Sequence, residues 1–578
     1  LSIRAETTPC RNHGIINTQN KETSMESQRS FLLIGLALVS FLLWQQWQQD
    51  YGPQPVQPAA SEQSSTNAGS NGVPSSLPGS DDVPVASQDD VPGMVQEAKP
   101  ESARTVHVLT DTLDLKIDLV GGDVVRANLV KFPLTQESSE NYSLLRPQDA
   151  LYIAQSGLVG RDGPDGNRSG RPRYDASQQE FVMQGDTLSV PLTWQNADGV
   201  KITKTFNFTK GSHDIALTYT IENNSGNTTT YQQYAQLKQT TQVPDGGNMF
   251  MPTYRGAAYG SEEDRYEKYT FDDIEDKNLK VSTEAGWVGM LEHYFVSAWI
   301  PPASQVNNLY TKLVQNQYAI IGFTGTPVNV ASGETATIGA ELYLGPKDQD
   351  NLAQLANGLD LTVDYGILWW LSQPLFALLQ FLHSLVGNWG VAIILITVIV
   401  KGAMYPLTKK QYESMARMRN LAPKMQQLKD RFGDDRQKMS QAMMELYRKE
   451  KVNPMGGCLP IILQMPIFLA LYWVLLESVE LRHADFFLWI TDLSVKDPYF
   501  VLPVLTGASM WLLQKLQPTT VTDPMQQKIM QFMPVAMSVF FLWFPAGLVL
   551  YWLVSNIITL IQAKLIYAAM EKKGLKSK

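Results

Sequence analysis

The sequence contains little cysteine and little histidine, with Cys10, Cys458 and six histidines among 578 residues. Two cysteines exclude a disulfide-rich scaffold and a cysteine-rich metal site. The H-E-x-x-H, G-x-S-x-G and P-loop patterns are also absent, which argues against metalloproteases, serine hydrolases and nucleotide hydrolases. The sequence therefore predicts no catalytic residue, no metal, no cofactor and no enzymatic activity.

Positive charge is scarce in one long part of the chain. Residues 50–360 contain 21 Lys and Arg against 39 Asp and Glu, a net charge of −18. The remaining residues contain 26 against 17, a net of +9, and the two parts sum to the overall −9. Such an uneven distribution of charge along the chain is not typical of a single globular domain. With a pI of about 5.4, direct sequence-specific binding of nucleic acid is not expected.

Formal charge is missing altogether from five long stretches. They are 30–49, 365–400, 458–476, 498–514 and 529–563. A membrane-spanning helix needs roughly 20 mostly apolar residues at about 1.5 Å rise per residue. The last stretch is too long for one crossing, and the sequence FPAG (544–547) predicts a turn between two antiparallel spans. In 365–400, Pro374 and the sequence GNWG (387–390) separate an interfacial amphipathic helix from a further span.

The basic residues of the short connections orient the six predicted transmembrane helices. Residues 405–451 contain 12 Lys and Arg and 6 acids, so this loop is expected in the cytoplasm. Residues 480–497 contain more acidic than basic residues and are expected outside, whereas the tail after Lys564 is basic. This arrangement leaves both termini in the cytoplasm and the acidic block 50–360 outside, between the first and second spans.

The first span has an alternative interpretation as a cleaved signal peptide, because its apolar core, 31–44, is short. The residues that follow lack a small-x-small cleavage site, and this favours an uncleaved anchor. Residues 1–24 have no periodicity, and Met25 resembles a natural start. We therefore expect 1–24 to be an upstream or non-native extension outside the fold.

The soluble segments differ in pattern. Residues 51–101 are rich in Pro, Ser, Gln, Gly and Asp and predict a disordered linker. Alternating runs such as LDLKIDL (113–119) and ITKTFNF (202–208) predict an all-β sandwich. In the cytoplasmic loop, apolar residues recur at three- and four-residue steps on both sides of 433–435, which predicts two short helices in an antiparallel hairpin. Pro423 is expected to kink the first arm.

These segments give one predicted order along the chain. It is extension 1–24, anchor 25–50, linker 51–101, external β-domain 102–347, interfacial helices 348–387, second span 388–407, cytoplasmic hairpin 408–452, third span 453–479, external loop 480–497, fourth span 498–516, cytoplasmic loop 517–527, fifth span 528–544, sixth span 546–566 and basic cytoplasmic tail 567–578.

Four motifs resemble those of the YidC membrane protein insertase family, which has relatives in mitochondria and chloroplasts. They are MYPLTKKQYESM (404–415), KVNPMGGCLPIILQMPIF (451–468), TDPMQQKIMQFMP (522–534) and FFLWFPAGLVLYWLVSN (540–556). The resemblance runs from Met25 to the C-terminus and matches the Gram-negative bacterial form. It implies a polytopic α-helical protein of the inner membrane with a conserved core of five helices and a periplasmic β-supersandwich. It also implies insertion and folding of nascent membrane proteins, alone or with the Sec translocon, without nucleotide hydrolysis.

Lys401 is the one formally charged residue in the interior of a proposed span. It lies about eight residues, roughly 12 Å, before Lys409 and Lys410. Its long side chain could reach the inner headgroups; alternatively, it could be a cation held in a hydrated groove, since an intramembrane charge is costly unless it is solvated or paired. The resemblance implies the groove, where the family usually has Arg. Lys keeps the charge but not the bidentate geometry of Arg, which favours a simple electrostatic role.

Two further sets of residues are singled out with the resemblance. The other candidates for the groove wall are Thr397, Gln464, Trp552, Asn556 and Gln562. Trp552 stands where the family often has Tyr. The candidates for contact with a client's transmembrane helix are Met465, Phe468, Tyr472, Phe532, Met533, Met537 and Phe540. Interhelical hydrogen bonding and ordinary packing are the alternative roles for the two sets.

The resemblance also implies partners: nascent membrane proteins, the Sec translocon, membrane lipids, and the ribosome and signal-recognition machinery at the cytoplasmic hairpin. The basic hairpin is equally compatible with a solvated positive-inside loop. A small-solute transporter is the competing function, and it predicts intramembrane charge pairs and internal repeats. The sequence instead has one uncompensated cation and two halves that look unrelated. His107, His213 and His293 appear isolated, so the β-domain is expected to be structural or to dock on the translocon.

Overall fold

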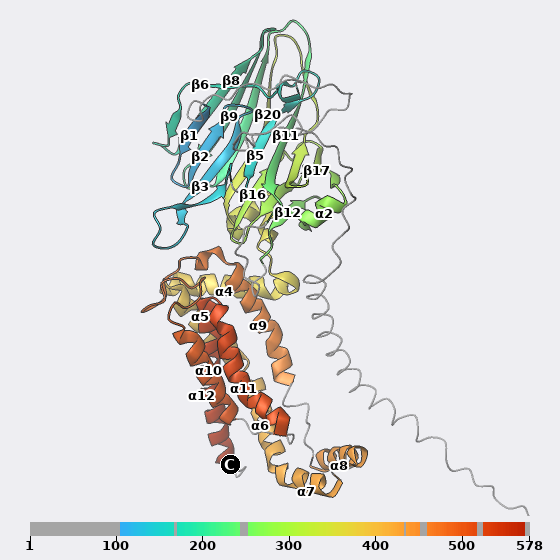
Figure 1. Ribbon diagram of the computed structural model, residues 1–578, viewed down its shortest axis with the longest axis vertical. Coiled ribbons are helices and arrows are strands. Elements are labelled where there is room, and N and C mark those ends of the chain that lie inside the picture. Colours follow the sequence, from blue (N-terminus) through green and yellow to red (C-terminus); the bar gives the residue numbers. More distant parts are fainter. Residues whose placement is uncertain are drawn as a thin grey trace, which may run out of the picture. The chain divides into compact units, whose positions relative to one another are not determined.

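The computed structural model describes residues 104–148, 150–166, 170–242, 253–432, 435–450, 459–516 and 524–572 (Figure 1). The predicted extension 1–24, anchor 25–50 and linker 51–101 lie outside these residues, and so do both cysteines. The described chain forms a β-rich part from Thr105 to Pro346 and a helical part that follows it.

Two sheets form the β-domain, and 11 of the described strands belong to the first (Figure 1). Its main path is β14 (Lys280–Thr283), β17 (Asn307–Val314), β18 (Tyr318–Thr324), β11 (Thr229–Thr240), β5 (Tyr152–Val159), β3 (Asp123–Pro133), β2 (Leu113–Asp118), β1 (Thr105–Leu109) and β7 (Glu180–Val182). Two further strands join it: β19 (Val328–Val330) pairs with β11, and β4 (Asn141–Leu145) pairs with β3. The second sheet has the order β13 (Glu267–Tyr269), β12 (Gly256–Gly260), β15 (Trp287–Leu291), β16 (Phe295–Ile300), β20 (Thr335–Pro346), β10 (Asp214–Asn223), β9 (Val200–Thr209), β8 (Thr187–Gln195) and β6 (Asp175–Ala176).

Period-two alternation explains how the sheets pack. In β9, Ile202, Phe206 and Phe208 are buried, whereas the threonines between them are only half-buried. Side chains from both sheets meet in one apolar core, for example Leu115 of β2 and Leu217 of β10. The sheets therefore form a sandwich with the core between them, as the alternation predicted.

The core of the sandwich also contains charge. Arg171 donates from Nε to Asp165 (2.9 Å) and pairs through Nη1 with Asp123, and all three side chains are almost fully buried. Lys204 lies on the buried face of β9 and donates 3.0 Å hydrogen bonds to the carbonyl oxygens of Gly121 and Ser156. We call Asp123, Asp165, Arg171 and Lys204 the buried ion cluster. Its two cations and two acids compensate one another, as buried charges require.

One short helix lies inside the β-domain, between β13 and β14, and two other α-helices come next after β20. α2 (Phe271–Asp276) begins with a capping box between Thr270 and Asp273. α3 (Gln349–Leu355) is capped by Asp348 and lies in the stretch expected to hold a short helix. α4 (Trp369–Val386) exposes Trp369, Trp370 and Phe381 but buries Phe376 and Leu379. This division is typical of an amphipathic helix at a membrane surface.

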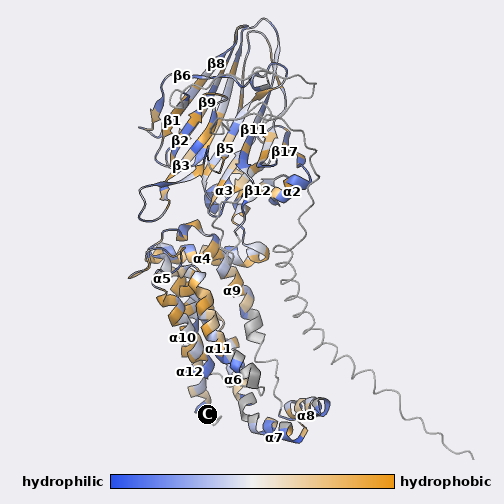
Figure 2. Ribbon diagram, viewed as in Figure 1, coloured by the Kyte–Doolittle hydropathy of each residue, from blue (hydrophilic) through white to orange (hydrophobic). Residues whose placement is uncertain are grey.

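The remaining helices contain most of the long apolar segments (Figure 2). They are α5 (Trp389–Ala403), α6 (Tyr405–Asn420), α7 (Ala422–Phe432), α8 (Arg436–Lys449), α9 (Leu459–Glu477), α10 (Val501–Leu516), α11 (Pro524–Phe540) and α12 (Ala546–Glu571). α12 packs against both α5 and α10, and α10 packs against α11. The shared apolar cluster includes Ile393, Leu471, Leu502 and Val549, one from each of four helices.

The lengths of these helices do not by themselves establish six spans. Within the described residues, α12 alone is long and apolar enough to cross a bilayer by its own length, and α5 with α6 passes the same test only as a pair bent by 60°. The apolar segments Gln464–Glu477, Val501–Leu516 and Gln531–Trp543 are shorter. The predicted count of six therefore stays a proposal.

Several element boundaries differ from the predicted ones. α5 ends at Ala403, inside the predicted span 388–407, because Pro406 lacks an N–H and its ring disfavours a straight continuation. α11 begins at Pro524, before residue 528, since proline suits the first helical position. α12 continues to Glu571, beyond 566, so the predicted tail begins within a helix.

The hairpin that was predicted for the cytoplasmic loop also differs in its first arm. The arm is interrupted next to Pro423, as predicted, but the break at Leu421 divides it completely into α6 and α7. α6 packs on α12 through Tyr412 and Ala416, so it is not part of a hairpin. α7 and α8 form the hairpin, and Met425 packs there with Met443, Leu446 and Tyr447.

Removing Arg171 tests the buried ion cluster. Arg171→Met should lower the free energy of unfolding of the β-domain by about 3–5 kcal/mol, because two acids are left buried without their cation. The control is Arg161→Met, which removes a pair of an exposed arginine with Asp162 and should cost less than about 1 kcal/mol. Urea-dependent pulse proteolysis of the full chain in detergent measures both. Equal losses in the two variants would contradict the assigned role.

The pH dependence of stability gives a second test. Burial lowers the pKa of Lys204 from 10.5 to about 7, against the opposing effect of Asp123. Between pH 7 and pH 9 the unfolded lysine is protonated and the folded one is largely neutral, so the free energy of unfolding should rise with pH. The contribution of Lys204 is at most about 1.4 kcal/mol per pH unit. Lys204→Met should remove this slope in the same proteolysis measurement; an unchanged slope would show that Lys204 is not its source.

Candidate functional site

Lys401 is buried near the end of α5, where it faces α12. Its side chain is 6% exposed, and its Nζ donates a 3.1 Å hydrogen bond to Oγ1 of Thr559. The backbone carbonyl of Lys401 accepts a 3.0 Å hydrogen bond from Nε2 of Gln562. Both the charge and the backbone of this turn of α5 are therefore bound by one face of α12.

That face of α12 is a polar stripe formed by Ser555, Thr559 and Gln562. The spacing of i, i+4 and i+7 places them on one side of the helix. The hydroxyl of Thr559 donates to the carbonyl oxygen of Ser555 (2.7 Å), which leaves its lone pairs directed for accepting from Lys401. Gln562 was among the predicted groove residues, whereas Ser555 and Thr559 were not. Their spacing with Gln562 in an otherwise apolar helix was the signal that could have found them.

The ammonium group of Lys401 has no ion-pair partner among the described residues. Its one described side-chain acceptor is a neutral hydroxyl. A charge in a low-dielectric environment is costly unless it is hydrated or paired. A single hydroxyl compensates only part of that cost, so the site is suited to water or to an incoming anionic group.

The other predicted groove residues take different roles. The hydroxyl of Thr397, one turn before Lys401, donates to the carbonyl oxygen of Ile393 (2.6 Å) within α5. Asn556 donates to Oγ of Ser509 (2.9 Å) and thereby connects α12 to α10. Gln464 is half-buried on α9. Of the predicted groove residues, Gln562 is the one that has a described hydrogen bond with Lys401.

Trp552 contributes an apolar wall. Its ring lies edge-on to Phe468 of α9, with centroids 4.5 Å apart, and 4.7 Å from the ring of Phe541. Phe541 is in the short 3-10 turn Phe541–Trp543 that precedes α12. The aromatic cluster therefore joins α9, α12 and the end of α11. In this cluster Trp552 packs through its ring, and this role does not require the hydroxyl group of the Tyr that the family often has here.

The predicted helix-contact residues divide between exposed and packed positions. Met465 of α9 and Phe532 and Met533 of α11 are about half exposed or more. Phe468, Tyr472 and Met537 are half-buried against the apolar cluster of the helices. Phe540 is 37% exposed. α9 and α11 thus present large apolar side chains at their surfaces, and Met adapts well to varied partners.

α11 is held close to α10 by small residues. Oγ of Ser538 donates to the carbonyl oxygen of Pro503 (2.9 Å). A Cβ added at Gly507 of α10 would lie 2.6 Å from Cβ of Ser538, so only glycine allows this approach. Small residues at a contact are the usual means of close helix packing in membranes.

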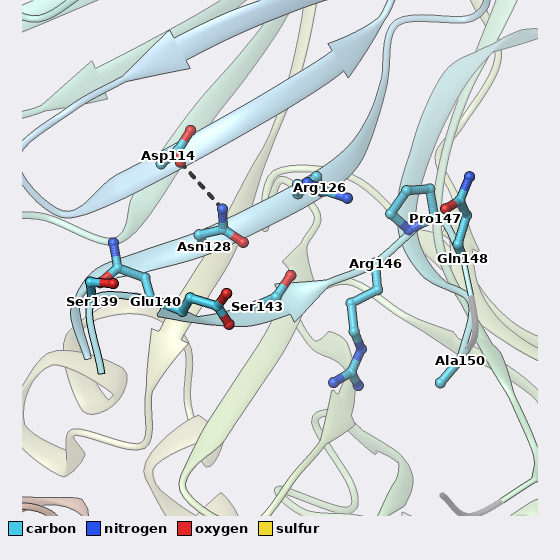
Figure 3. Close-up of a pocket in the computed structure, with 11 residues that line it drawn as sticks. Asp114, Arg126, Asn128, Ser139, Glu140, Ser143, Arg146, Pro147, Gln148 and Ala150 are labelled. Carbon is cyan, nitrogen blue, oxygen red and sulfur yellow. Dashed lines mark hydrogen bonds between the residues drawn. The ribbon is translucent and has the colours of Figure 1, made fainter. Parts of the chain in front are cut away.

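The β-domain contains a separate polar groove (Figure 3), lined by residues of β2, β3 and β4 and of the loops on either side of β4. Asn128 donates to Asp114 there (3.2 Å), and Asp114 also lies 2.8 Å from Nε2 of His107. His107 is therefore paired and not isolated, contrary to our expectation. The groove is open and has charges of both signs, from Arg126 and Arg146 as well as Asp114.

Two family models together match most of the chain. The YidC periplasmic domain matches residues 105–378, and the 60Kd inner membrane protein family matches residues 381–573. The membrane protein insertase YidC of Pseudoalteromonas atlantica is 63% identical over 557 residues, which cover 96% of this chain and all of that protein. This chain belongs to the YidC membrane protein insertase family. The family resemblance in the sequence is thereby confirmed, with a periplasmic β-rich domain and a C-terminal helical domain of an inner-membrane protein.

Other relatives agree. The membrane protein insertase YidC of Shewanella pealeana is 56% identical over 559 residues, covering 96% of this chain and all of that protein. A solved structure of active YidC insertase with its first transmembrane domain resolved covers 81% of this chain and 93% of its own, at 18% identity and a TM-score of 0.36. A galactose mutarotase-like protein from Lactobacillus casei covers 42% of this chain and 99% of its own, at 10% identity and a TM-score of 0.31. At these TM-scores neither structural likeness adds to the argument.

Replacing Thr559 tests its hydrogen bond to Lys401. Thr559→Val keeps the shape but removes the acceptor, and we expect it to lower the free energy of unfolding by about 1–2 kcal/mol. Thr559→Ser keeps the hydroxyl and should cost clearly less. Reversible unfolding in mixed detergent micelles, followed by circular dichroism, measures both variants. If valine and serine are tolerated equally, the hydroxyl does not stabilise the ammonium group.

Proposed function

We propose that this inner-membrane insertase moves the polar ends of nascent membrane proteins across the bilayer through a hydrated, positively charged groove beside α5 and α12. Insertion of membrane proteins follows from membership of the YidC family. The groove is an additional part of this proposal. The observation that supports the groove best is a buried lysine, Lys401, with a neutral hydroxyl as its described side-chain partner.

The physical reason for such a groove is the cost of carrying polar groups through hydrocarbon. Each unsatisfied backbone or side-chain polar group costs several kcal/mol there. A hydrated wall of hydroxyl and amide groups shortens the dry distance that a client segment must cross. A cation without a carboxylate partner also attracts acidic residues of that segment, by several kcal/mol at most for a close pair at an intermediate dielectric.

The client's apolar helix needs a separate surface. We propose that it leaves the groove along α9 and α11, where Met465, Phe532 and Met533 are exposed. Nonspecific dispersion and adaptable methionine side chains allow such a surface to accept many sequences. The close contact of α10 with α11 at Gly507 would keep this surface beside the groove.

Six spans with both termini in the cytoplasm remain part of the proposal. The apolar segments of α5, α9, α10, α11 and α12 would supply five of them, and the first would lie in residues 25–50, outside the described chain. Helices as short as α5, with 15 residues or about 22 Å, would require a locally thin bilayer or hydrated ends.

We further propose that the α7–α8 hairpin meets the ribosome and the signal-recognition machinery, and that the Sec translocon and lipids are additional partners. Among the described residues, the two arms of the hairpin are joined by a small apolar contact and by the ion pair of Lys424 with Glu450 (2.6 Å). Many of its described side chains are exposed, and several of them are basic, namely Arg431, Lys438, Arg448 and Lys449.

Reversing the charge at residue 401 tests the groove. Lys401→Glu should reduce insertion of a single-span client with an acidic outer segment by at least about tenfold, because attraction becomes repulsion. Lys401→Arg should retain most activity. Lys564→Glu makes the same charge change on an exposed position of α12 and is the matched control. The measurement is protease protection of the client in liposomes that contain only the purified protein.

The outcomes separate the function from the groove. Protein-dependent protection that Lys401→Glu leaves unchanged would retain the insertase and reject an electrostatic role for Lys401. A folded protein that gives no protection at all would mean that insertion requires the translocon, or that the chain transports small solutes instead.

A further inference from the structure

The loop that joins α9 to α10 has two large apolar side chains exposed at its tip. Phe487 is 68% exposed and Leu488 is 75% exposed. They are adjacent in the chain, so together they form one apolar projection. We call these two residues the loop tip.

The loop tip is held in a strained turn. Leu488 has φ of +58°, a left-handed conformation that leucine seldom adopts. The turn is closed by hydrogen bonds from the N–H of Phe486 to the carbonyl oxygen of Ile490 (3.0 Å) and from the N–H of Ile490 to that of Phe487 (3.2 Å). Backbone strain of this kind persists where the surroundings impose it and is often linked to function.

A buried carboxylate makes the rest of the loop rigid. Asp497, which is 1% exposed, accepts hydrogen bonds from Nε1 of Trp489 (3.0 Å) and from the backbone N–H groups of Tyr499 (3.0 Å) and Leu502 (2.7 Å). Leu502 is in the first turn of α10. The same side chain therefore fixes the base of the loop tip and the start of α10.

The loop is also bound to the first residues of α5 and α12. Asn388, which caps α5, donates to the carbonyl oxygens of Asp485 and Phe486, both at 3.1 Å. The N–H groups of Ala546 and Gly547 donate to the carbonyl oxygens of Val495 (2.7 Å) and Leu493 (2.9 Å). The loop tip is thus fixed at the same end of the bundle as the starts of three apolar helices.

That end of the bundle is where α4 enters it from the periplasmic domain. α4 begins 23 residues after β20 ends at Pro346 and leads into α5 at Trp389. Exposed aromatic residues lie before and after the loop tip in the chain. They are Trp369 and Trp370 in α4 and Tyr499 just before α10. Trp and Tyr are enriched where helices leave the hydrocarbon and enter the headgroups.

From this geometry we infer that the loop tip inserts Phe487 and Leu488 into the periplasmic leaflet of the inner membrane. The loop tip contacts phospholipid in this proposal, because hydrogen bonds fix it to the ends of membrane helices and because neither of its side chains is charged. The depth expected for such an interfacial element is about 5–10 Å below the headgroup level. The inference rests on the proposed topology, in which this loop faces the periplasm.

A depth measurement tests the inference on the full chain. In a background with Cys10→Ser and Cys458→Ser, Leu488→Cys is labelled with an environment-sensitive fluorophore and placed in phosphatidylethanolamine–phosphatidylglycerol nanodiscs. Nitroxide lipids labelled near the headgroup should quench this fluorophore more than lipids labelled deep in the acyl chain. Ile557→Cys on the exposed side of α12 should show the reverse order, and Gln184→Cys in the β-domain should show no quenching.

The possible results decide between a lipid and other neighbours. Quenching at residue 488 that equals that at 184 would overturn insertion. An apolar environment at residue 488 without lipid quenching would also overturn it, in favour of a protein partner or a second copy of the chain. Modification of Leu488→Cys by an impermeant maleimide in spheroplasts tests the side of the membrane independently, so that wrong topology and failed insertion are distinguished.

A second variant separates insertion from folding. Leu488→Asn keeps the turn, since asparagine tolerates the left-handed conformation, but it removes the apolar group. With a label at Phe487→Cys, this change should reduce quenching by headgroup-level nitroxide lipids while leaving thermal unfolding in detergent unchanged or raised. Unchanged quenching would show that Leu488 makes no contact with lipid.

Discussion

A charge buried among apolar helices must be hydrated, paired or hydrogen-bonded, and this requirement dominates the helical domain. Lys401 meets it through Thr559, and Gln562 binds the backbone of the same turn of α5. The polar stripe of α12 thereby packs against α5, while Asn556 on the same helix donates a hydrogen bond to Ser509 of α10. The same few contacts that hold the helices together also leave the ammonium group without a carboxylate partner among the residues that the structure describes. In the proposed mechanism, helix packing and client insertion would thus depend on one set of side chains.

The β-domain meets the same physical requirement differently. In its buried ion cluster Arg171 pairs with two acids, and both Arg171 and Lys204 donate to backbone carbonyl oxygens. A fully compensated cluster of this kind rigidifies a core and has nothing left to offer a ligand. The contrast with Lys401 is informative, because the two buried lysines differ in the number of opposite charges nearby. Lys204 has acids of the ion cluster close by, whereas Lys401 has a hydroxyl.

Much of the fold followed from local patterns. The alternation in 113–119 and 202–208 predicted strands, and it even put Lys204 on the same face as Ile202 and Phe206. What alternation did not show was why a lysine is tolerated there, since its acidic and carbonyl partners come from β3, β5 and the segment around Asp165. Likewise, the three- and four-residue spacing predicted the cytoplasmic helices, but not that α6 would leave the hairpin to pack on α12. The burial of Lys204 and the packing of α6 on α12 both depend on contacts between residues far apart in the chain.

The sequence by itself determined the class of the protein, the β-rich and helical segments, the family and the unusual position of Lys401, because charge, hydropathy and motif spacing are local properties. Only the tertiary structure identified Thr559 as the partner of Lys401, moved Trp552 into an aromatic cluster, and showed that Phe487 and Leu488 are held outward by Asp497 and by the ends of α5 and α12. Several of these contacts join distant segments: Lys401 and Thr559 are 158 residues apart, and Asn388 and Phe486 are 98 residues apart. Periodicity along the chain carries no information about which of its polar groups will meet.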